Sequence, residues 1–284
     1  MPENYFCGWY FKAQSESKTI AVIAAYHFTR GQPSCSVQII TDTAAYNATY
    51  PFEEYKNLRG GRCICIGKSR FTRQGIKLDI KTDELCVKGL LRFGEWTPIS
   101  YDIMGPFALV PFMECRHTVL SMKHTVNGRI TLNGEVFEFK NAVGYTEGDR
   151  GRSFPSVYAW TQCNFEGGSL MFSAADIPIL GLHFTGIIGV IMIGKKQHRI
   201  ATYLGARPLS IKDGSITVRQ GSYTFTATLI KKNARPLNAP VSGSMTRTIH
   251  ESAACTASYR LTKNGRTLLD ITTNKAAFEY EFEG

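Results

Sequence analysis

HTVLSMKHTVNGRITLNGEVFEF, residues 117–139, joins segments of β-branched, aromatic and polar residues through two Asn-Gly pairs, Asn127-Gly128 and Asn133-Gly134. Asn-Gly favours the positive φ angles of two-residue hairpin turns. Two further pairs, Asp213-Gly214 and Asn264-Gly265, lie between segments of the same composition, so each of these pairs is predicted to close a hairpin. Because no long amphipathic pattern with helix caps occurs, we expect an all-β protein.

The strand-like segments fall into two groups, separated by GYTEGDRGRSFP at residues 144–155. We interpret this segment, rich in Gly, Arg and acidic residues, as a hinge between two antiparallel barrels or sandwiches in tandem, residues 1–143 and 144–284. A single β domain of this length is the alternative. Since ligand sites favour domain interfaces, we expect a binding cleft near the hinge.

The composition is that of a packed globular protein. Of 284 residues, 43% are hydrophobic and 20% charged, and 33 Lys and Arg against 23 Asp and Glu give a net charge of +10. The basic residues are scattered, with only the pairs Lys195-Lys196 and Lys231-Lys232 adjoining, so we expect no nucleic-acid partner. An ordinary solvated surface explains this charge, and attraction to an anionic membrane surface is the alternative.

The first twenty residues lack the apolar core of a secretory signal. The longest apolar run, residues 177–194, is interrupted by Pro178, His183 and glycines, which argues against a spanning helix. We therefore expect a cytoplasmic protein, with peripheral membrane contact as the alternative. The eight cysteines show no CxxC spacing, which argues against a disulfide framework or a zinc cage. Cys63 and Cys65 are interpreted as buried small residues rather than ligands of a soft metal, and neither a metal nor a cofactor is expected.

A strand over SVYAWTQCNF, residues 156–165, would place Tyr158, Trp160, Gln162 and Asn164 on one face and only small residues on the other. Two aromatic rings followed by two carboxamides would suit the wall of a cavity for a ring with a polar head group. The alternative is an exposed face that uses its aromatic residues for cross-strand pairs.

Charged residues precede this strand. Glu147 and Asp149 lie close to Arg152, and such a group can supply an acid and an orienting cation, or else surface ion pairs of little energy. The block at residues 104–117 ends with Glu114 and His117, although a lone His is more often structural than catalytic. No HExxH, P-loop, GxGxxG or GxSxG motif occurs, which argues against nucleotide-dependent and serine-hydrolase chemistry.

Several of these blocks resemble the tocopherol cyclase family. Its pattern D-W-G-x-S-F-P followed by W-x-Q-C-N is matched by residues 149–155 and 160–164, except that Arg150 stands where the pattern has Trp. Further similarity lies in GWYFK at residues 8–12, in the block at residues 104–117, and in TIHES at residues 248–252. The resemblance implies two lipocalin-like β-barrels, related to carotenoid hydratases, that hold a hydrophobic ligand.

The resemblance also implies a reaction: protonation of a prenyl double bond, and capture of the resulting cation by a phenol oxygen. Asp149 or Glu147 would then be the acid. The residues expected to contact the substrate are Arg152, Tyr158, Trp160, Gln162, Asn164, Trp9, Tyr10, Glu114 and His117. The function expected is cyclisation or isomerisation of a prenylated phenol or another hydrophobic isoprenoid, without metal or cofactor.

Two other functions remain open on the residues alone. A non-catalytic binder or carrier of lipids or isoprenoids needs the cavity but no acid. A carbohydrate-active site would use Glu147 and Asp149 as its carboxylate pair, but residues two apart in sequence are poorly placed to flank a scissile bond.

Overall fold

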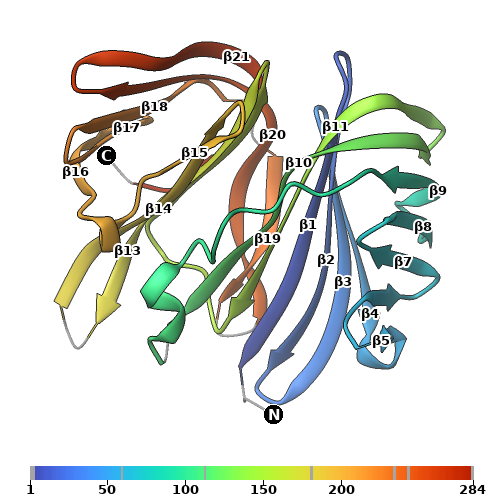
Figure 1. The fold of residues 1–284 in the computed structure, drawn as a ribbon. Helices are drawn as coiled ribbons and strands as arrows, with labels where there is room; N and C mark the ends of the chain where they lie inside the picture. Colours follow the sequence, from blue (N-terminus) through green and yellow to red (C-terminus); the bar gives the residue numbers. More distant parts are fainter. Residues whose placement is uncertain are drawn as a thin grey trace. The chain divides into compact units, whose positions relative to one another are not determined.

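The computed structural model describes residues 4–58, 60–111, 113–179, 182–232, 235–241 and 244–282, and it describes their side chains except at 179, 182, 235–241 and 244–252. In these ranges the chain forms antiparallel strands joined by hairpins and by short 3₁₀ helices (Figure 1). The helices are η1 (Phe52–Glu54), η2 (Gly105–Leu109) and η3 (Thr202–Leu204). The all-β prediction is confirmed.

The first sheet contains the strands of the amino-terminal half. They are β1 (Tyr5–Gln14), β2 (Thr19–Thr29), β3 (Gln32–Thr41), β4 (Ala45–Pro51), β5 (Tyr55–Leu58), β6 (Cys63–Ile66), β7 (Ser69–Thr72), β8 (Gly75–Lys81), β9 (Cys86–Phe93), β10 (Cys115–Leu132) and β11 (Glu135–Gly151). Their order across the sheet is β4-β3-β2-β1-β11-β10-β9-β8-β7-β6-β5. Strand β11 therefore lies between β1 and β10.

The second sheet contains the remaining strands. They are β12 (Tyr158–Phe165), β13 (Gly168–Ile179), β14 (Leu182–Ile193), β15 (Lys196–Arg199), β16 (Arg207–Lys212), β17 (Ser215–Gln220), β18 (Tyr223–Lys231), β19 (Arg235–Val241), β20 (Ser244–Lys263) and β21 (Arg266–Tyr280). Their order is β15-β14-β13-β12-β21-β20-β18-β17-β16, and β19 pairs with β20. The block at residues 248–252 falls on β20, and the structure does not describe the side chains of these five residues.

The chain divides into two compact units that are each discontinuous in sequence. The first contains residues 1–98, 114–154 and 237–248, and the second contains residues 99–113, 155–236 and 249–284. The boundary expected between residues 143 and 144 falls inside β11. The segment interpreted as a hinge is a strand as far as Gly151, because it pairs with β1 on one side and with β10 on the other.

The turn chemistry explains three of the hairpins. Asn133-Gly134, Asp213-Gly214 and Asn264-Gly265 have positive φ at both residues, as two-residue turns require. Asn127-Gly128 behaves differently. It lies within β10 and does not form the hairpin that its sequence predicts. The register with β11 shifts between Val126 and Gly128 because β11 has one extra residue there, a β-bulge at which Asn141 has positive φ.

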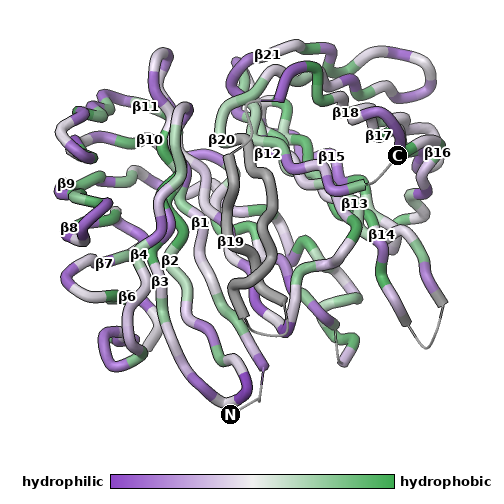
Figure 2. Tube along the Cα trace, turned by 180° about the vertical axis from the view of Figure 1, so that it is seen from behind, coloured by the Kyte–Doolittle hydropathy of each residue, from purple (hydrophilic) through white to green (hydrophobic). Residues whose placement is uncertain are grey.

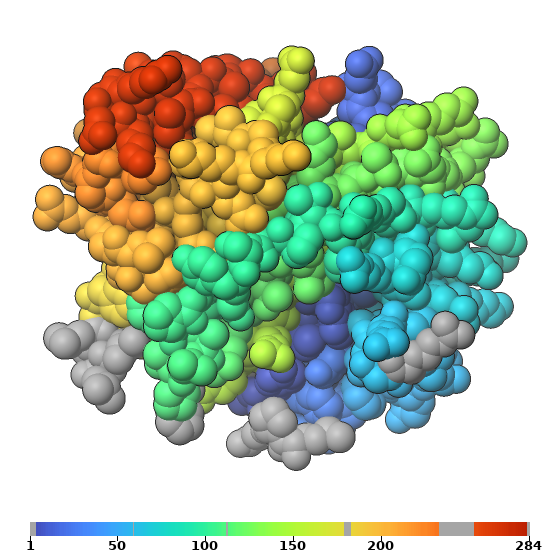
Figure 3. Space-filling view, viewed as in Figure 1, coloured from blue at the N-terminus to red at the C-terminus, as the bar shows by residue number. Residues whose placement is uncertain are grey.

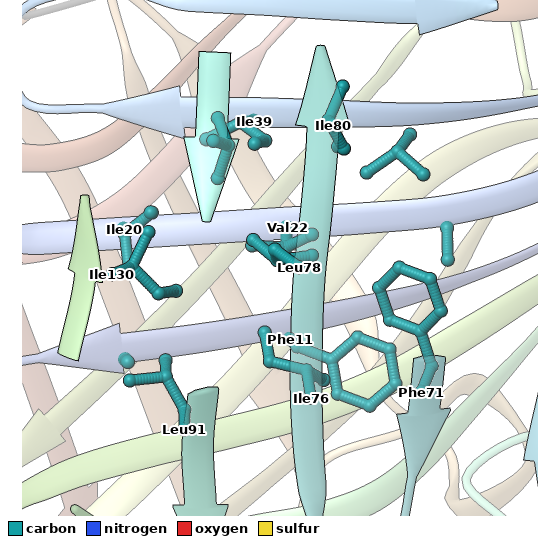
Figure 4. Packing of buried hydrophobic residues seen from close by; sticks show 14 of the residues in the cluster. Phe11, Ile20, Val22, Ile39, Phe71, Ile76, Leu78, Ile80, Leu91 and Ile130 are labelled. Atoms are coloured by element: carbon teal, nitrogen blue, oxygen red, sulfur yellow. The ribbon is translucent and has the colours of Figure 1, made fainter. Parts of the chain in front are cut away.

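One face of the first sheet encloses an apolar core. Outer strands such as β8 and β9 alternate hydrophobic and hydrophilic residues (Figure 2), and in β8 Ile76, Leu78 and Ile80 are buried. Figure 4 shows these side chains beside Ile39 and Phe11, which come from the other end and the centre of the sheet. Because strands from both ends share one cluster, the sheet must curl around it.

The second sheet encloses a core of its own. Ala159 and Cys163 of β12 belong to it, together with Phe172 of β13 and Phe225 of β18, whose ring centroids lie 4.9 Å apart. The small side chains of β12 therefore pack against the neighbouring layer, as their pattern predicts. Within the described residues, no helix is long and apolar enough to serve as a transmembrane span.

Some central strands are buried on both faces. Residues 10–14 of β1, 35–41 of β3 and 144–147 of β11 are continuously buried, although only alternate residues reach the core cluster. Strand β12 is buried in the same way at residues 158–163. In these strands the second face is also removed from water, and it carries polar side chains.

Candidate active site

The register of β1 and β11 separates their side chains into two sets. Phe11 and Ala13 of β1 enter the core, so Tyr10 and Lys12 point to the opposite face. Tyr10 pairs with Glu147, and Lys12 pairs with Tyr145. Because cross-strand partners share a face, β1 and β11 present these four residues together. We call this surface of the first sheet the polar face.

Asp149 and His117 extend the polar face. Asp149 follows Glu147 by two residues on β11, and His117 of β10 pairs with Asp149 across the sheet. The imidazole lies between the two carboxylates. Its Nδ1 is 2.9 Å from Oδ1 of Asp149 in hydrogen-bond geometry, and its Nε2 is 3.1 Å from Oε2 of Glu147 as an ion pair.

Two further side chains hold the carboxylates. The hydroxyl of Tyr145 donates a hydrogen bond of 2.5 Å to Oε2 of Glu147. The thiol of Cys115 contacts Oδ1 of Asp149 at 3.5 Å. Glu147 is therefore held by two groups and is buried, whereas the side chain of Asp149 keeps 22% of its surface exposed. Asp149 is the more accessible of the two candidate acids.

The charges of this cluster favour an imidazolium. Burial by itself lowers the pKa of His117, but the charges of Asp149 and Glu147 and their hydrogen bonds outweigh burial and hold that pKa well above its usual value of 6.5. Burial, together with the charge of Glu147, raises the pKa of Tyr145, so its hydroxyl remains protonated and donates. His117 is thus held as a cation between the carboxyl groups of Asp149 and Glu147.

The same three side chains carry atoms that could bind a metal ion. His117, Glu147 and Asp149 offer ligand atoms that lie within 4.8 Å of one another. The two carboxylates, however, approach different nitrogens of one imidazole ring, and a metal ion binds only one of these nitrogens. The arrangement fits a protonated imidazole between carboxylates better than it fits a shared ion.

The second unit contains the other polar cluster that the sequence singled out. Tyr158, Trp160 and Gln162 are buried on the face of β12 opposite the apolar core, and Asn164 is half-buried at the end of this row. The hydroxyl of Tyr158 donates a hydrogen bond to Oε2 of Glu279 on β21. The alternation of these residues in the sequence predicts that they share a face. The contact with Glu279 could not be predicted in this way, because Glu279 lies on a strand more than a hundred residues later.

Other predicted site residues lie outside the His117 cluster. Trp9 points to the core side of β1, and its ring centroid is 6.3 Å from that of Tyr26. Arg152 is exposed, and its backbone N–H donates to the carbonyl oxygen of Glu114, which precedes β10. Arg150, which replaces the Trp of the family pattern, is exposed and points to the face opposite Asp149.

The sequence analysis missed three residues of the cluster or of its face. Tyr145 and Cys115 contact the carboxylates, and Lys12 is only 1% exposed although its side chain ends in an amine. A lysine within the run GWYFKA, where both alternating sets are otherwise aromatic or small, was the available signal for Lys12. The eight cysteines are all free thiols. Cys63 of β6 is buried as predicted, whereas Cys65 is half-buried.

The chain is similar in sequence to known proteins. A family model described as tocopherol cyclase-like matches residues 73–280. The chain is 31% identical over 120 residues to the probable chloroplastic tocopherol cyclase of Oryza sativa subsp. japonica, an alignment covering 39% of this chain and 26% of the rice protein. The chain thus matches only about a quarter of that relative's length.

Solved structures show the same fold at low sequence identity. The crystal structure of CghA has a TM-score of 0.62 at 8% identity, covering 100% of this chain and 90% of that one. Kievitone hydratase from Nectria haematococca has a TM-score of 0.56 at 11% identity, covering 98% and 89%. The fold is shared throughout, and the family model spans most of the sequence, including His117, Glu147 and Asp149. The chain therefore belongs to the tocopherol cyclase-like family.

Proposed function

We propose that this protein is an enzyme that cyclises a prenylated phenol by acid catalysis. The observation that carries the proposal is the imidazolium of His117 held between two carboxylates, one of which, Asp149, is partly accessible. Adding a proton to an alkene needs an acid whose conjugate base is stabilised as it forms. Preorganised charges at such a site are among the strongest contributions to catalysis.

The two carboxylates take different roles in this proposal. Both contacts of Asp149 are made by Oδ1, so its Oδ2 is the oxygen that carries the proton to be donated. Glu147 is tied to Tyr145 and to the other nitrogen of His117, which suits it to positioning the imidazolium. Asp149 is thus proposed as the catalytic acid and Glu147 as a positioning residue.

The reaction balances without another reactant. The O–H bond of protonated Asp149 breaks as its proton bonds to the less substituted alkene carbon, which leaves a tertiary cation. The negative charge left on Asp149 faces the protonated Nδ1 of His117 at 2.9 Å. The phenol oxygen then bonds to the cation, and its proton returns to Asp149. The product is an isomer of the substrate.

We propose that a hydrophobic ligand contacts two surfaces, the polar face of the first sheet and the row of polar and aromatic residues on β12. On the polar face, Tyr10 pairs with Glu147 and offers an aromatic ring beside the carboxylates, where a cation is stabilised by ring electrons. On β12, the buried rings of Tyr158 and Trp160 and the amide of Gln162 are proposed to contact ligand. A carrier would use the same surfaces without proton transfer.

The test is incubation of the purified protein with a prenylated hydroquinone in D₂O. The exchangeable proton of Asp149 is replaced by deuterium, so we expect an isomeric product that has lost one phenol hydroxyl and gained one deuterium on carbon. Mass spectrometry and NMR detect both changes. Recovery of unchanged ligand that stays bound to the protein would contradict the enzyme and favour a carrier.

We also propose that the second unit contacts an anionic membrane surface, from which hydrophobic substrate is drawn. Three leucines in or near the two 3₁₀ helices of this unit are exposed: Leu109 at the end of η2 is 86% exposed, Leu204 at the end of η3 44%, and Leu209 on β16 55%. Figure 3 shows the green segment near residue 105 beside the amber segment near residue 203, and the rings of Phe107 and Tyr203 lie 6.0 Å apart.

Charge supports an anionic partner for this surface. Arg207 of β16 and Arg219 of β17 are exposed and lie directly opposite each other, an arrangement that is unfavourable unless anions screen it. Lipid headgroups supply such anions, and each basic residue near an anionic bilayer contributes about 1 kcal/mol.

Vesicle sedimentation tests this surface. A variant with Leu109→Ser, Leu204→Ser and Leu209→Ser is expected to bind phosphatidylcholine–phosphatidylserine vesicles at least tenfold more weakly than the unaltered protein, because burying a leucine side chain contributes roughly 1.5–3 kcal/mol. The matched control is Leu58→Ser with Leu90→Ser, at 41% and 40% exposure in the first unit. Equal losses of vesicle binding in both variants, or no sedimentation of the unaltered protein with vesicles, would refute the proposed membrane-binding surface.

A further inference from the structure

A line of basic side chains crosses the strands of the first sheet from β5 to β10. Successive cross-strand partners form this line, so they share one face of the sheet. Five strand spacings separate its two ends, which makes it about 24 Å long. The sequence scatters these basic residues, and the strand pairing brings them together. We call the line the basic row, and its residues are Lys56, Cys65, Arg70, Lys77, Leu90 and Arg129.

The basic row points away from the apolar core. Ile76 and Leu78 of β8 are buried in that core, so Lys77 between them lies on the opposite face. Figure 1 shows β7, β8 and β9 side by side. The Lys and Arg residues of the row are all exposed, and its leucine, Leu90, is 40% exposed. The row therefore offers its positive charge to a partner.

Two more basic residues flank the row. Lys88 and Arg92 lie two residues to either side of Leu90 on β9, share its face and are exposed. Among the described residues of β7–β11, the acidic residues that share this face nearby are Asp79, opposite Lys88, and Glu138, which forms an ion pair with the last residue of the row. Positive charge therefore predominates on this face.

The row contains an unfavourable pair. Arg70 and Lys77 lie directly opposite each other in the hairpin of β7 and β8. Like charges at opposite positions destabilise a sheet. Neither residue forms an ion pair with another residue in the part of the chain that the structure describes. An anionic group that lies between the two side chains would remove their repulsion.

The shape of this face distinguishes between anionic partners. The sheet curls around its core, so the face with the basic row is convex. A flat bilayer would touch a convex face only along a narrow line. Single-stranded nucleic acids stack their bases on aromatic side chains, and the row has none. An extended peptide can follow the curve: at about 3.3 Å per residue, roughly seven residues span the row, and alternate side chains point toward it.

We propose that the basic row binds an extended acidic segment of a partner protein. Carboxylates of the segment lie against Arg70 and Lys77, and an apolar side chain of the segment packs on Leu90. The contact is exposed, so salt screens its charges and weakens it. The proposal does not depend on the proposed function, because it uses no residue of the His117 cluster or of the row on β12.

Fluorescence anisotropy with a fluorescein-labelled decaglutamate peptide tests the proposal. The unaltered protein is expected to bind this peptide at about 0.05 M salt, where exposed charges are weakly screened. A variant with Arg70→Glu and Lys77→Glu should bind the peptide roughly tenfold more weakly, because two attractive contacts become repulsive.

The matched control is Lys231→Glu with Lys232→Glu. Both lysines are exposed in the second unit, and their replacement changes the net charge by the same amount. The affinity of the control should stay within about threefold of that of the unaltered protein. Arg70→Glu alone is the check on folding. It places opposite charges across the hairpin, so it should raise the urea midpoint of unfolding while it weakens peptide binding.

Several results would overturn the proposal. They are no binding of decaglutamate by the unaltered protein, full binding by the Arg70→Glu, Lys77→Glu variant, or equal losses in both double variants, which would show an effect of net charge alone. Oligothymidylate and phosphatidylcholine–phosphatidylserine vesicles are the comparison probes. If either bound more tightly than decaglutamate, and only to protein with the basic row intact, the row would belong to a nucleic acid or a membrane and the acidic protein partner would be refuted.

Discussion

Replacing Asp149 with asparagine is expected to lower the turnover of a prenylated phenol by roughly 10²–10⁴-fold, the usual contribution of a positioned general acid. Asparagine keeps the size of the side chain and still accepts a hydrogen bond from Nδ1 of His117, but it has no acidic proton. The turnover number should therefore fall while substrate binding changes little. Steady-state kinetics on the purified variant measures both quantities.

The chain offers a matched control for this variant. Asp176 also contacts Nδ1 of a histidine, His183, at 2.6 Å, but that pair is on the outside of the second unit. Asp176→Asn is expected to leave turnover unchanged. If Asp149→Asn kept full turnover and Glu147→Gln lost it, the acid would be Glu147, and the division of roles proposed here would be wrong.

Replacing His117 with glutamine is expected to lower the free energy of unfolding by about 3–5 kcal/mol, because two buried carboxylates then lose their cation. We expect a loss near the lower end of this range, because 22% of the side chain of Asp149 is exposed and water can partly solvate its charge. Urea unfolding measures the loss. His183→Gln is the control: its side chain is 62% exposed, so the change should stay within about 1 kcal/mol.

The stability that His117 contributes should depend on pH in a defined direction. The pKa of His117 is higher in the folded protein than its usual value of 6.5, so folding is favoured by the protonated form. The contribution is fully present below about pH 6.5 and is lost as the pH rises through the higher folded value. The stability difference between the unaltered protein and His117→Gln should shrink with rising pH. A difference that grows would contradict the imidazolium.

Local patterns in the sequence predict the β class and three of the turns. The positive φ angles of Asn133-Gly134 follow from residue type alone, and the shared face of Tyr158, Trp160 and Gln162 follows from alternation. The place of Asn127-Gly128 inside a strand, opposite a β-bulge of β11, could not be predicted in this way. Asn-Gly closes a turn or stays within a strand according to whether the pairing with β9 and β11 continues past it, and this pairing depends on distant residues.

The cluster of His117, Glu147 and Asp149 depends on this register shift together with two others, between Val119 and Ser121 and between Ser121 and His124. Extrapolated from the turn at Asn133-Gly134 without bulges, the register of β10 and β11 would place Arg150 opposite His117. The register shifts along β10 bring Asp149 there instead. A shift of one residue moves every side chain to the other face. The sequence therefore identified the two acids and the histidine as candidates but could not predict that they lie in contact.

Nitrogen-15 NMR of the imidazole of His117 measures the charge on which the proposed chemistry depends. With His117→Gln used to assign the signals, both ring nitrogens should remain protonated at about pH 8, well above the usual midpoint of a histidine. In Asp149→Asn the midpoint should fall toward that usual value. A ring in the unaltered protein that is neutral at about pH 8 would show that no imidazolium is held between the carboxylates, and the account of the acid would fail.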